Sequence, residues 1–211
     1  MSQRKDAKPH LIQPIYHSQA SRSSPASYPK RIVDAALRVF ERLGVPRTRL
    51  EDVANEAGVS RPLVYQYFAN RQALLDAAIV KKIEHHLEQQ KKSMPKKANF
   101  VDSVVKGAII AIDLARRDTV MLDLFEHSSV QRLPELLLNA EMPVHTIILD
   151  LWRPIFEAAR KSGELRPDIS DDDLLEWLLS INYMFGLRDD VTNRRLEELL
   201  RLFVIPALVP H

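Results

Sequence analysis

Residues 50–67 place two short amphipathic segments on either side of a tight turn, Gly58-Val59-Ser60. Gly58 can adopt a positive φ at little steric cost, and the Ser60 side chain can accept a hydrogen bond from the first turn of the following helix. This pattern predicts a helix-turn-helix, whose second helix would enter the major groove of DNA. Arg61 lies in the first turn of that helix. Because one arginine can bind guanine O6 and N7 together, we expect Arg61 to read bases directly.

Other side chains near the turn have the chemistry to hold the DNA backbone. We expect Thr48 and Ser60 to cap the N-termini of the two helices, where anions are favoured. Arg49 and Arg71 could position phosphates through their charge, although Arg49 could also be an ordinary surface residue. Leu63 could contact a thymine methyl group or pack into the core of the domain, and the sequence leaves both options open.

The remaining sequence lacks the residue patterns of common enzymes. The chain has no cysteine, which excludes disulfides, thiolate metal sites and cysteine nucleophiles. It has no phosphate-binding glycine loop, no H-E-x-x-H pair and no G-x-S-x-G elbow. His85 and His86 are adjacent and so diverge around their helix, and residues 171–173 lack the spacing of a calcium loop. We therefore expect no catalytic residues, no cofactor and no metal.

The charge of the chain is unevenly distributed. Residues 1–97 contain 18 Lys/Arg and 9 Asp/Glu, whereas residues 98–211 contain 12 and 19. A basic front half suits a polyanion, and it adds weight to the helix-turn-helix pattern. No apolar run approaches the roughly 20 residues that cross a bilayer, and no apolar segment follows the basic N-terminus. We expect a cytoplasmic protein that does not enter a membrane.

The pattern of apolar residues predicts an all-α protein of about nine helices in two domains. Residues 1–28 are expected to be a disordered basic arm, with residues 29–75 as the helix-turn-helix domain and 76–211 as a second helical domain. The predicted helices cover about 29–43, 61–68, 99–115, 118–131, 134–162, 171–187 and 192–208. We also expect a short second helix capped by Thr48, with Glu51 at the capping-box position and Leu50, Val53, Ala54 and Ala57 facing inward, and a long fourth helix after 70–71 that ends near 92. Because the helical phase continues through Pro143 and Pro154, we expect 134–162 to be one kinked helix, with two segments joined at 141–143 as the alternative.

Residues 29–75 resemble the DNA-binding domain of the TetR family of transcriptional repressors. The resemblance rests on Ile32-Val33-Asp34-Ala35-Ala36 with Phe40 and Gly44, on Asp52-Val53-Ala54 with Ala57-Gly58-Val59-Ser60, and on Tyr65-Gln66-Tyr67-Phe68 followed by Asn70-Arg71-Gln72-Ala73-Leu74-Leu75. Gly163 to Asp168 is similar to the family's turn before its last two helices. The resemblance implies that Tyr65 contacts the DNA backbone, with Tyr67 at another contact position. Tyr67 could equally extend from the small core with its hydroxyl in water.

The resemblance further implies that the last two helices pair with a second copy of the chain in a four-helix bundle. Their apolar residues agree with such a dimer, although burial inside one subunit is the alternative. The dimer candidates are Leu174, Leu178, Ile181, Leu196, Leu199, Leu200 and Phe203. The resemblance also implies an inducer cavity among the middle helices. The candidates there are Glu126, His127, His145, Trp152, Phe156, Asn182 and Tyr183.

Together these features predict the function of the chain. The chain would be a DNA-binding transcriptional regulator, a ligand-released homodimeric repressor that binds a palindromic operator through the helix at 61–68. Its partners would be double-stranded DNA, a second copy and a small-molecule effector, and it would work in the bacterial cytoplasm, on the nucleoid when bound to its operator. The alternative is a helical protein–protein interaction module that no longer reads DNA.

Overall fold

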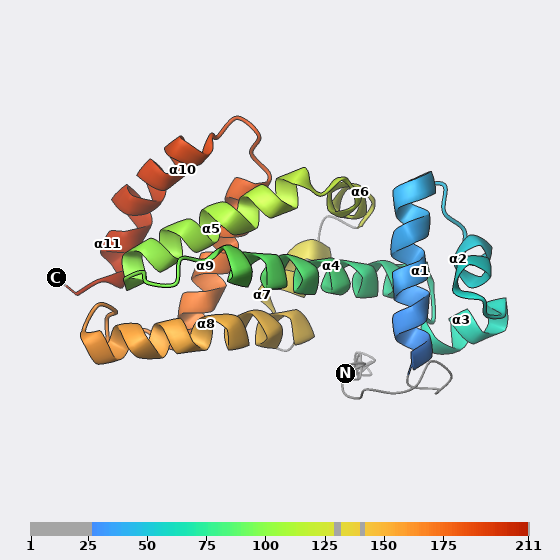
Figure 1. Ribbon diagram of the computed structural model, residues 1–211, viewed down its shortest axis with the longest axis horizontal. Helices are drawn as coiled ribbons and strands as arrows, with labels where there is room; N and C mark the ends of the chain where they lie inside the picture. Colours follow the sequence, from blue (N-terminus) through green and yellow to red (C-terminus); the bar gives the residue numbers. More distant parts are fainter. Residues whose placement is uncertain (1–26, 129–131, 140–141, 211) are drawn as a thin grey trace, which may run out of the picture.

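The computed structural model describes residues 27–128, 132–139 and 142–210, and every regular element in these ranges is a helix (Figure 1). Helices α1 (Tyr28–Leu43), α2 (Leu50–Ala57) and α3 (Arg61–Tyr67) form a small unit at one end of the molecule. The long helix α4 (Arg71–Ser93) leads from this unit into the second group of helices. The all-α, two-part architecture is therefore confirmed, whereas the predicted arm at 1–28 falls almost wholly outside the described residues.

The second group contains α5 (Phe100–Arg117), α6 (Thr119–His127), α7 (Arg132–Leu138), α8 (Pro143–Ser162) and α9 (Asp171–Gly186). It closes with α10 (Asn193–Leu199), a π-helical turn (Leu200–Val204) and α11 (Ile205–Leu208) in one continuous run. Pro206 has no N–H, so it cannot donate the regular helical hydrogen bond to the carbonyl of Leu202. This missing bond involves a residue of the π-helical turn. Helix α4 packs between α5 and α8, and α9 packs against α5 (Figure 1).

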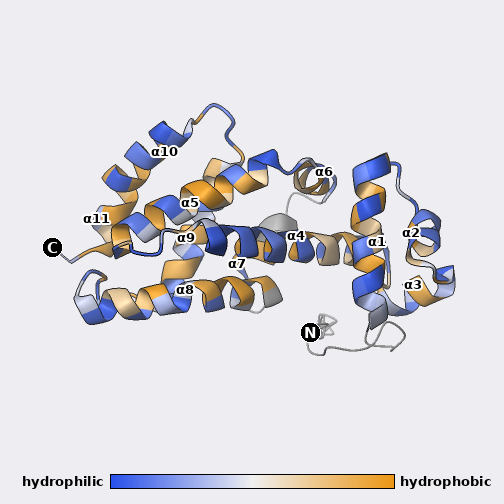
Figure 2. Ribbon diagram, viewed as in Figure 1, coloured by the Kyte–Doolittle hydropathy of each residue, from blue (hydrophilic) through white to orange (hydrophobic). Residues whose placement is uncertain are grey.

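Apolar periodicity positions the three front helices around one small core. Ile32, Ala36 and Phe40 recur along one face of α1 and are buried. Val64 on α3 and Phe68 directly after it close the core. Figure 2 shows hydrophilic and hydrophobic residues alternating around the same helices, as expected when one face packs and the other meets solvent.

The predicted cap at Thr48 is wrong. Helix α2 begins at Leu50, and the Asp52 carboxylate accepts the N–H of Arg49 at 2.9 Å, so a residue inside the first turn does the capping. The Thr48 side chain is buried, and its hydroxyl donates to the carbonyl of Gly44 at 2.8 Å. The loop after α1 is short, and its turn directs Thr48 back toward that loop rather than toward α2.

The single helix predicted over 134–162 is also wrong, and the alternative with two segments is correct. Helix α7 ends at Leu138, and α8 begins at Pro143, which occupies the first turn, where a missing N–H costs nothing. Helix α8 then continues through Pro154 to Ser162, as predicted. The helix predicted over 118–131 ends earlier than expected, at His127, and residues 129–131 lie outside the described residues.

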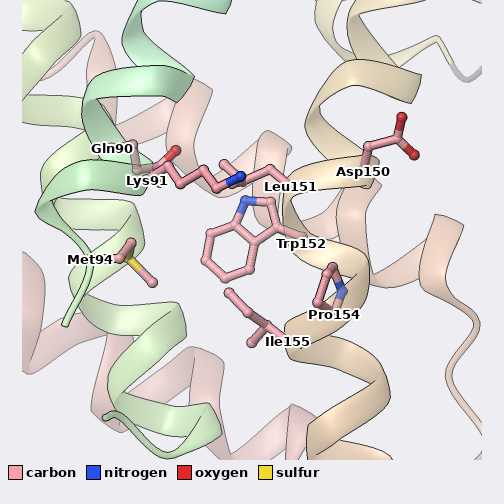
Figure 3. A pocket seen from close by; sticks show the side chains of 8 residues that line it. All are labelled: Gln90, Lys91, Met94, Asp150, Leu151, Trp152, Pro154 and Ile155. Carbon is pink, nitrogen blue, oxygen red and sulfur yellow. The ribbon is translucent and has the colours of Figure 1, made fainter. Parts of the chain in front are cut away.

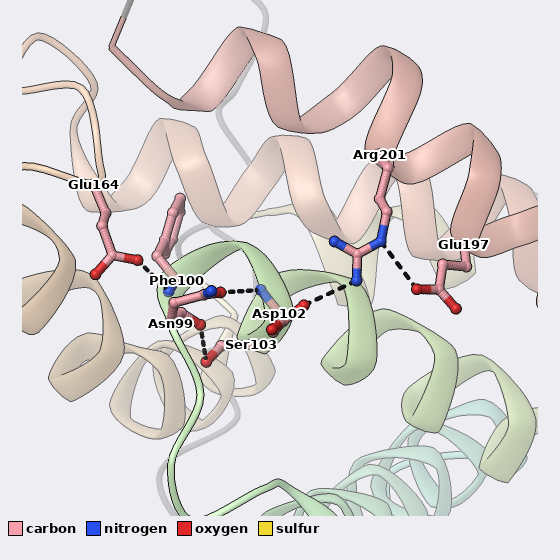
Figure 4. Close-up of polar contacts among 7 residues, drawn as sticks. All are labelled: Asn99, Phe100, Asp102, Ser103, Glu164, Glu197 and Arg201. Atoms are coloured by element: carbon pink, nitrogen blue, oxygen red, sulfur yellow. Dashed lines mark hydrogen bonds and ion pairs between the residues drawn. The ribbon is translucent and has the colours of Figure 1, made fainter.

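Polar contacts join the start of α5 to two other parts of the second domain (Figure 4). The Glu164 carboxylate accepts the N–H of Phe100 at 2.7 Å, from the turn that follows α8. Arg201 in the π-helical turn donates to Asp102 at 2.8 Å and to Glu197 at 2.9 Å. The Arg201 hydrogen bond lowers the pKa of the Asp102 carboxyl below its usual value. The turn at Gly163, where φ is 75°, thus anchors α5 as well as ending α8.

Candidate nucleic-acid interface

The turn between α2 and α3 has the geometry that the sequence predicts. Gly58 adopts φ 63° and ψ 40°, in the left-handed region, and the N–H of Val59 donates to the carbonyl of Ala54 at 3.0 Å. The Ser60 hydroxyl accepts the N–H of Leu63 at 3.4 Å and caps α3. The helix-turn-helix is confirmed, and its short turn fixes α3 against α2.

Arg61 is exposed at the start of α3, and two side chains hold its guanidinium. Its Nη1 lies 2.7 Å from the Glu51 carboxylate, and its Nη2 donates to the Tyr65 hydroxyl at 3.3 Å. The same guanidinium lies over the Tyr65 ring, 5.5 Å from the centroid. The hydrogen bond to Tyr65 and the charge of Glu51 raise the pKa of Arg61, which stays charged.

The other residues predicted to contact DNA divide into an exposed group and a structural group. Arg49 and Tyr65 are exposed, whereas Leu63 is half-buried beside the fully buried Val64. Tyr67 is half-buried, and its ring centroid lies 6.3 Å from that of Tyr28, which agrees with its position at the edge of the core. The interface that the structure presents therefore centres on α3 and the start of α2.

Arg71 and Thr48 both bind the loop between α1 and α2. The Arg71 guanidinium donates to the carbonyl of Val45 at 2.5 Å, and Thr48 donates to Gly44 as described above. Both side chains therefore stabilise the loop that positions α2. Their predicted phosphate contacts are untested, and a phosphate would have to share donors that already have partners.

Three acidic contacts in this domain escaped sequence reasoning. Glu56 on α2 accepts from Arg38 at 2.8 Å and from Arg42 at 3.1 Å on α1, and these hydrogen bonds lower the pKa of Glu56. The third contact is the Glu51–Arg61 pair. The spacing of Arg38 and Arg42 indicates one face of α1, but nothing in the local sequence indicates which acid they meet.

Residues 32–78 match the family model described as bacterial regulatory proteins, tetR family. This match covers the helix-turn-helix unit of the chain, which is therefore a tetR-family DNA-binding domain. The HTH-type transcriptional regulator TtgW of Pseudomonas putida, itself uncharacterized, is 42% identical over 59 residues, which are 28% of this chain and 43% of that protein. The chain spans less than half the length of that protein and of three other Pseudomonas putida regulators that it matches.

Solved structures of transcriptional regulators share the fold over most of the chain. The repressor QsdR from R. erythropolis superposes with a TM-score of 0.64 at 16% identity, covering 89% of this chain and 98% of that chain. The regulator FadR from Bacillus subtilis, solved in complex with stearoyl-CoA, superposes with a TM-score of 0.52 at 18% identity. The superposition covers 81% of this chain and 96% of that chain. At these identities the likeness concerns the fold alone.

Two side chains, Asp123 on α6 and Arg71 on α4, bind the backbone of Val45 in the loop between α1 and α2. The Asp123 carboxylate on α6 accepts the N–H of Val45 at 2.6 Å, while Arg71 on α4 binds the carbonyl of Val45. Val45 is fully buried. The loop before α2 is therefore held jointly by α4 and α6.

Helix α6 is in turn held to α4 through its N-cap, Asp118. This carboxylate accepts the N–H of Met121 at 3.0 Å and contacts Lys82 at 2.5 Å and His86 at 2.8 Å. Burial raises the pKa of Asp118, but these hydrogen bonds outweigh burial and leave it below its usual value. Burial lowers the pKa of His86 against the opposing effect of Asp118, while Lys82 and His85 lower it further.

A pocket of about 250 Å³ opens between α4 and α8, with Trp152 at its base (Figure 3). It is lined by Gln90, Lys91, Met94, Asp150, Leu151, Trp152, Pro154 and Ile155. Of the seven predicted effector residues, all within the described part of the chain, Trp152 alone lines it. Phe156 stacks on Trp152 with centroids 5.8 Å apart and is fully buried behind it.

The other predicted effector residues do not gather around this pocket. His145 is buried, and Asn182 and Tyr183 are half-buried on α9, where the Asn182 Oδ1 has no hydrogen-bond partner among the described residues. Glu126 and His127 are exposed on α6, where they cluster with Asp123. Sequence reasoning missed Gln90 and Lys91, which belong to a mainly polar stretch of α4.

Most residues predicted for the dimer interface are buried within the single chain. Leu174, Leu178, Ile181, Leu196 and Leu200 are buried because α9 and α10 turn their apolar faces toward α5. Leu199 is half-buried, and Phe203 is 67% exposed, as an interface residue would be. Other exposed apolar side chains on these elements are Trp177, Met184, Leu187 and Leu202. No helix in the described ranges is long and apolar enough to cross a membrane.

Proposed function

We propose that this chain is a transcriptional regulator of the TetR family that binds double-stranded DNA through α3. The observation that carries the proposal is Arg61, a charged and exposed side chain at the start of the second helix of a helix-turn-helix. Its guanidinium can bind guanine O6 and N7, while Arg49 and Tyr65 are exposed beside it to hold phosphates. The basic front half of the chain supplies a favourable electrostatic setting.

The active form in this proposal is a homodimer on a palindromic operator. A two-fold dimer presents two recognition helices, which is the arrangement that helix-turn-helix proteins use to span two half-sites. The exposed Leu202 and Phe203 in the π-helical turn, together with Trp177 and Met184 seven residues apart on α9, supply apolar surface for the contact. We propose these residues in place of the buried leucines.

We propose that the pocket between α4 and α8 receives a small-molecule effector. Its wall is mainly apolar, with Trp152 at the base, and Lys91 and Asp150 contribute one charge of each sign, which suits an apolar or acyl-type ligand. The structural neighbour FadR, which binds stearoyl-CoA in its crystal structure, supports this class of ligand. Repression released by ligand follows the family pattern.

The mechanism of release rests on reciprocal coupling between the two sites. A ligand that binds better to a form with displaced recognition helices must weaken DNA binding by the same factor. Helix α4 carries Gln90 and Lys91 of the pocket at one end and Arg71, bound to Val45, at the other. A shift of α4 would thus reach the loop that positions α2 and α3. Such a regulator would work in the bacterial cytoplasm and on the nucleoid when bound.

The proposal is tested by selecting binding sites from random DNA with the full-length protein. Enrichment of a palindrome, followed by release on addition of an acyl compound, is the expected result. The competing function is a helical protein–protein interaction module that no longer reads DNA. Absence of enrichment at low salt would favour that module instead.

A further inference from the structure

We propose that Glu51 determines how strictly this protein discriminates between DNA sequences, by holding Arg61 away from phosphates. Glu51 lies in the first turn of α2, outside the recognition helix, and no role in reading DNA follows from its position alone. The inference rests on the proposed DNA-binding function. Its basis is the set of contacts that fix the Arg61 side chain before any DNA is bound.

Three contacts from two helices orient the guanidinium of Arg61. The Glu51 carboxylate takes Nη1 at 2.7 Å, the Tyr65 hydroxyl accepts from Nη2 at 3.3 Å, and the Tyr65 ring lies 5.5 Å from the guanidinium carbon. An arginine carries five N–H donors in a rigid plane, so its other donors stay available to a base edge. The Tyr65 oxygen acts as an acceptor here, which leaves its own proton for a phosphate.

The carboxylate of Glu51 has no other assigned role in this domain. The cap of α2 is supplied by Asp52, whose carboxylate accepts the N–H of Arg49. Both partners of the ion pair remain accessible, with 46% of the Glu51 side chain and 54% of the Arg61 side chain exposed. A substitution at Glu51 therefore changes the environment of Arg61 while the cap, the turn at Gly58 and the core stay as they are.

This arrangement treats bases and phosphates differently. A phosphate can capture Arg61 fully only by displacing the Glu51 carboxylate, whereas a guanine edge can use donors that the carboxylate leaves free. When a phosphate captures Arg61, the Glu51 carboxylate is left unpaired and repels the same backbone, whereas the pair stays intact when a guanine binds Arg61. Glu51 thus weakens binding to arbitrary DNA more than binding to a site with guanine opposite Arg61, which is how repulsion creates specificity.

The test compares wild type with Glu51→Gln on two labelled duplexes, the selected site and a scrambled duplex of equal composition. Gln keeps the size of the side chain and removes its charge. We expect the affinity for the scrambled duplex to rise about two- to fivefold, because an exposed ion pair is worth at most about a fivefold change in an equilibrium. The affinity for the selected site should change little, so the discrimination ratio should fall about two- to fivefold.

A double-mutant cycle with Arg61→Ala separates positioning from a general charge effect. If Glu51 acts through Arg61, adding Glu51→Gln to Arg61→Ala should cause no further fall in the discrimination ratio. The matched control is Glu41→Gln, which removes the same charge from an exposed residue of α1 that pairs with no described residue. This control should keep the wild-type ratio.

Two results would overturn the inference while the wild type still discriminates between the duplexes. One is a discrimination ratio in Glu51→Gln that equals the wild-type ratio. The other is a fall in this ratio that is equal whether Glu51→Gln is made in the wild type or in Arg61→Ala. Failure of the proposed function looks different, because the wild type itself would then show no preference for any duplex. Circular dichroism at matched concentration should show that each variant keeps the wild-type helix content.

Discussion

Replacing Gly107 by alanine should destabilise the second domain, because Trp152 occupies the space of the added methyl group. A Cβ built on Gly107 would lie 2.5 Å from Cη2 and 2.8 Å from Cζ2 of the Trp152 ring. The obstacle is a rigid ring that is itself 6% exposed and stacked on Phe156, so the ring can move aside only by losing packing contacts. The base of the pocket therefore depends on the missing side chain at Gly107.

The magnitude follows from two opposing effects. Overpacking a well-filled core costs about 1–3 kcal/mol, while alanine gains about 0.5–1 kcal/mol over glycine inside a helix. The net loss in the free energy of unfolding should be about 1–2 kcal/mol. For a chain of this length that loss corresponds to a fall of roughly 2–8 °C in Tm. The emission of Trp152 should shift to longer wavelength as the ring moves toward water.

The matched control is Gly186→Ala in α9, where no heavy atom lies within 4 Å of the built Cβ. This variant keeps only the gain in helix propensity, so its Tm should equal or exceed that of wild type. Both variants are melted at one protein concentration, because self-association would otherwise shift Tm. Equal Tm values for the two variants, with unchanged tryptophan emission, would refute the packing of Trp152 against Gly107.

Three further perturbations test other parts of the structure. Because burial lowers the pKa of His86 despite Asp118, the folded state resists protonation, so stability in urea should fall as pH drops from about 7 to 5. In His86→Gln, stability in urea should depend less on pH over this range. In His85→Gln, which changes the exposed neighbour, the pH dependence should equal that of the wild type. Asp123→Ala should lower the free energy of unfolding by about 1–3 kcal/mol, since it removes the acceptor of a buried residue's N–H, and urea melts would measure it. Phe203→Glu should shift the protein to the monomer in analytical ultracentrifugation, and an unchanged dimer mass would exclude Phe203 from the interface.

The parts of the fold that depend on neighbouring residues in sequence could be predicted. Gly58 fixes the turn through its left-handed backbone conformation, and Ser60 fixes it through a hydrogen bond from the N–H of Leu63. The helix-turn-helix could therefore be predicted from the local sequence. Helical spacing indicated Phe68 and either Leu63 or Val64 as core residues, and the structure buries Val64. Thr48 shows the limit, because two nearby side chains could cap α2 and the fold of the loop decides which one does.

The parts that depend on tertiary packing could not be predicted. The periodicity of Leu174 and Leu196 indicates an apolar face, but it does not say whether that face meets α5 or a second subunit. The pocket joins Gln90 on α4 with Trp152 on α8, two residues far apart in sequence and without a shared motif. Arg61 was predicted as a reader of bases, yet its partner Glu51 becomes visible only when α2 and α3 are placed together.

The most direct test of the central claim is a fluorescence anisotropy titration of the selected duplex and its scrambled counterpart over a series of salt concentrations. We expect tight binding to the selected duplex, a steep loss of affinity with salt, and a clear loss of preference in Arg61→Ala. Arg49→Ala should weaken binding to both duplexes alike. Equal affinity of the wild type for both duplexes, or no binding at low salt, would contradict the claim that α3 reads DNA.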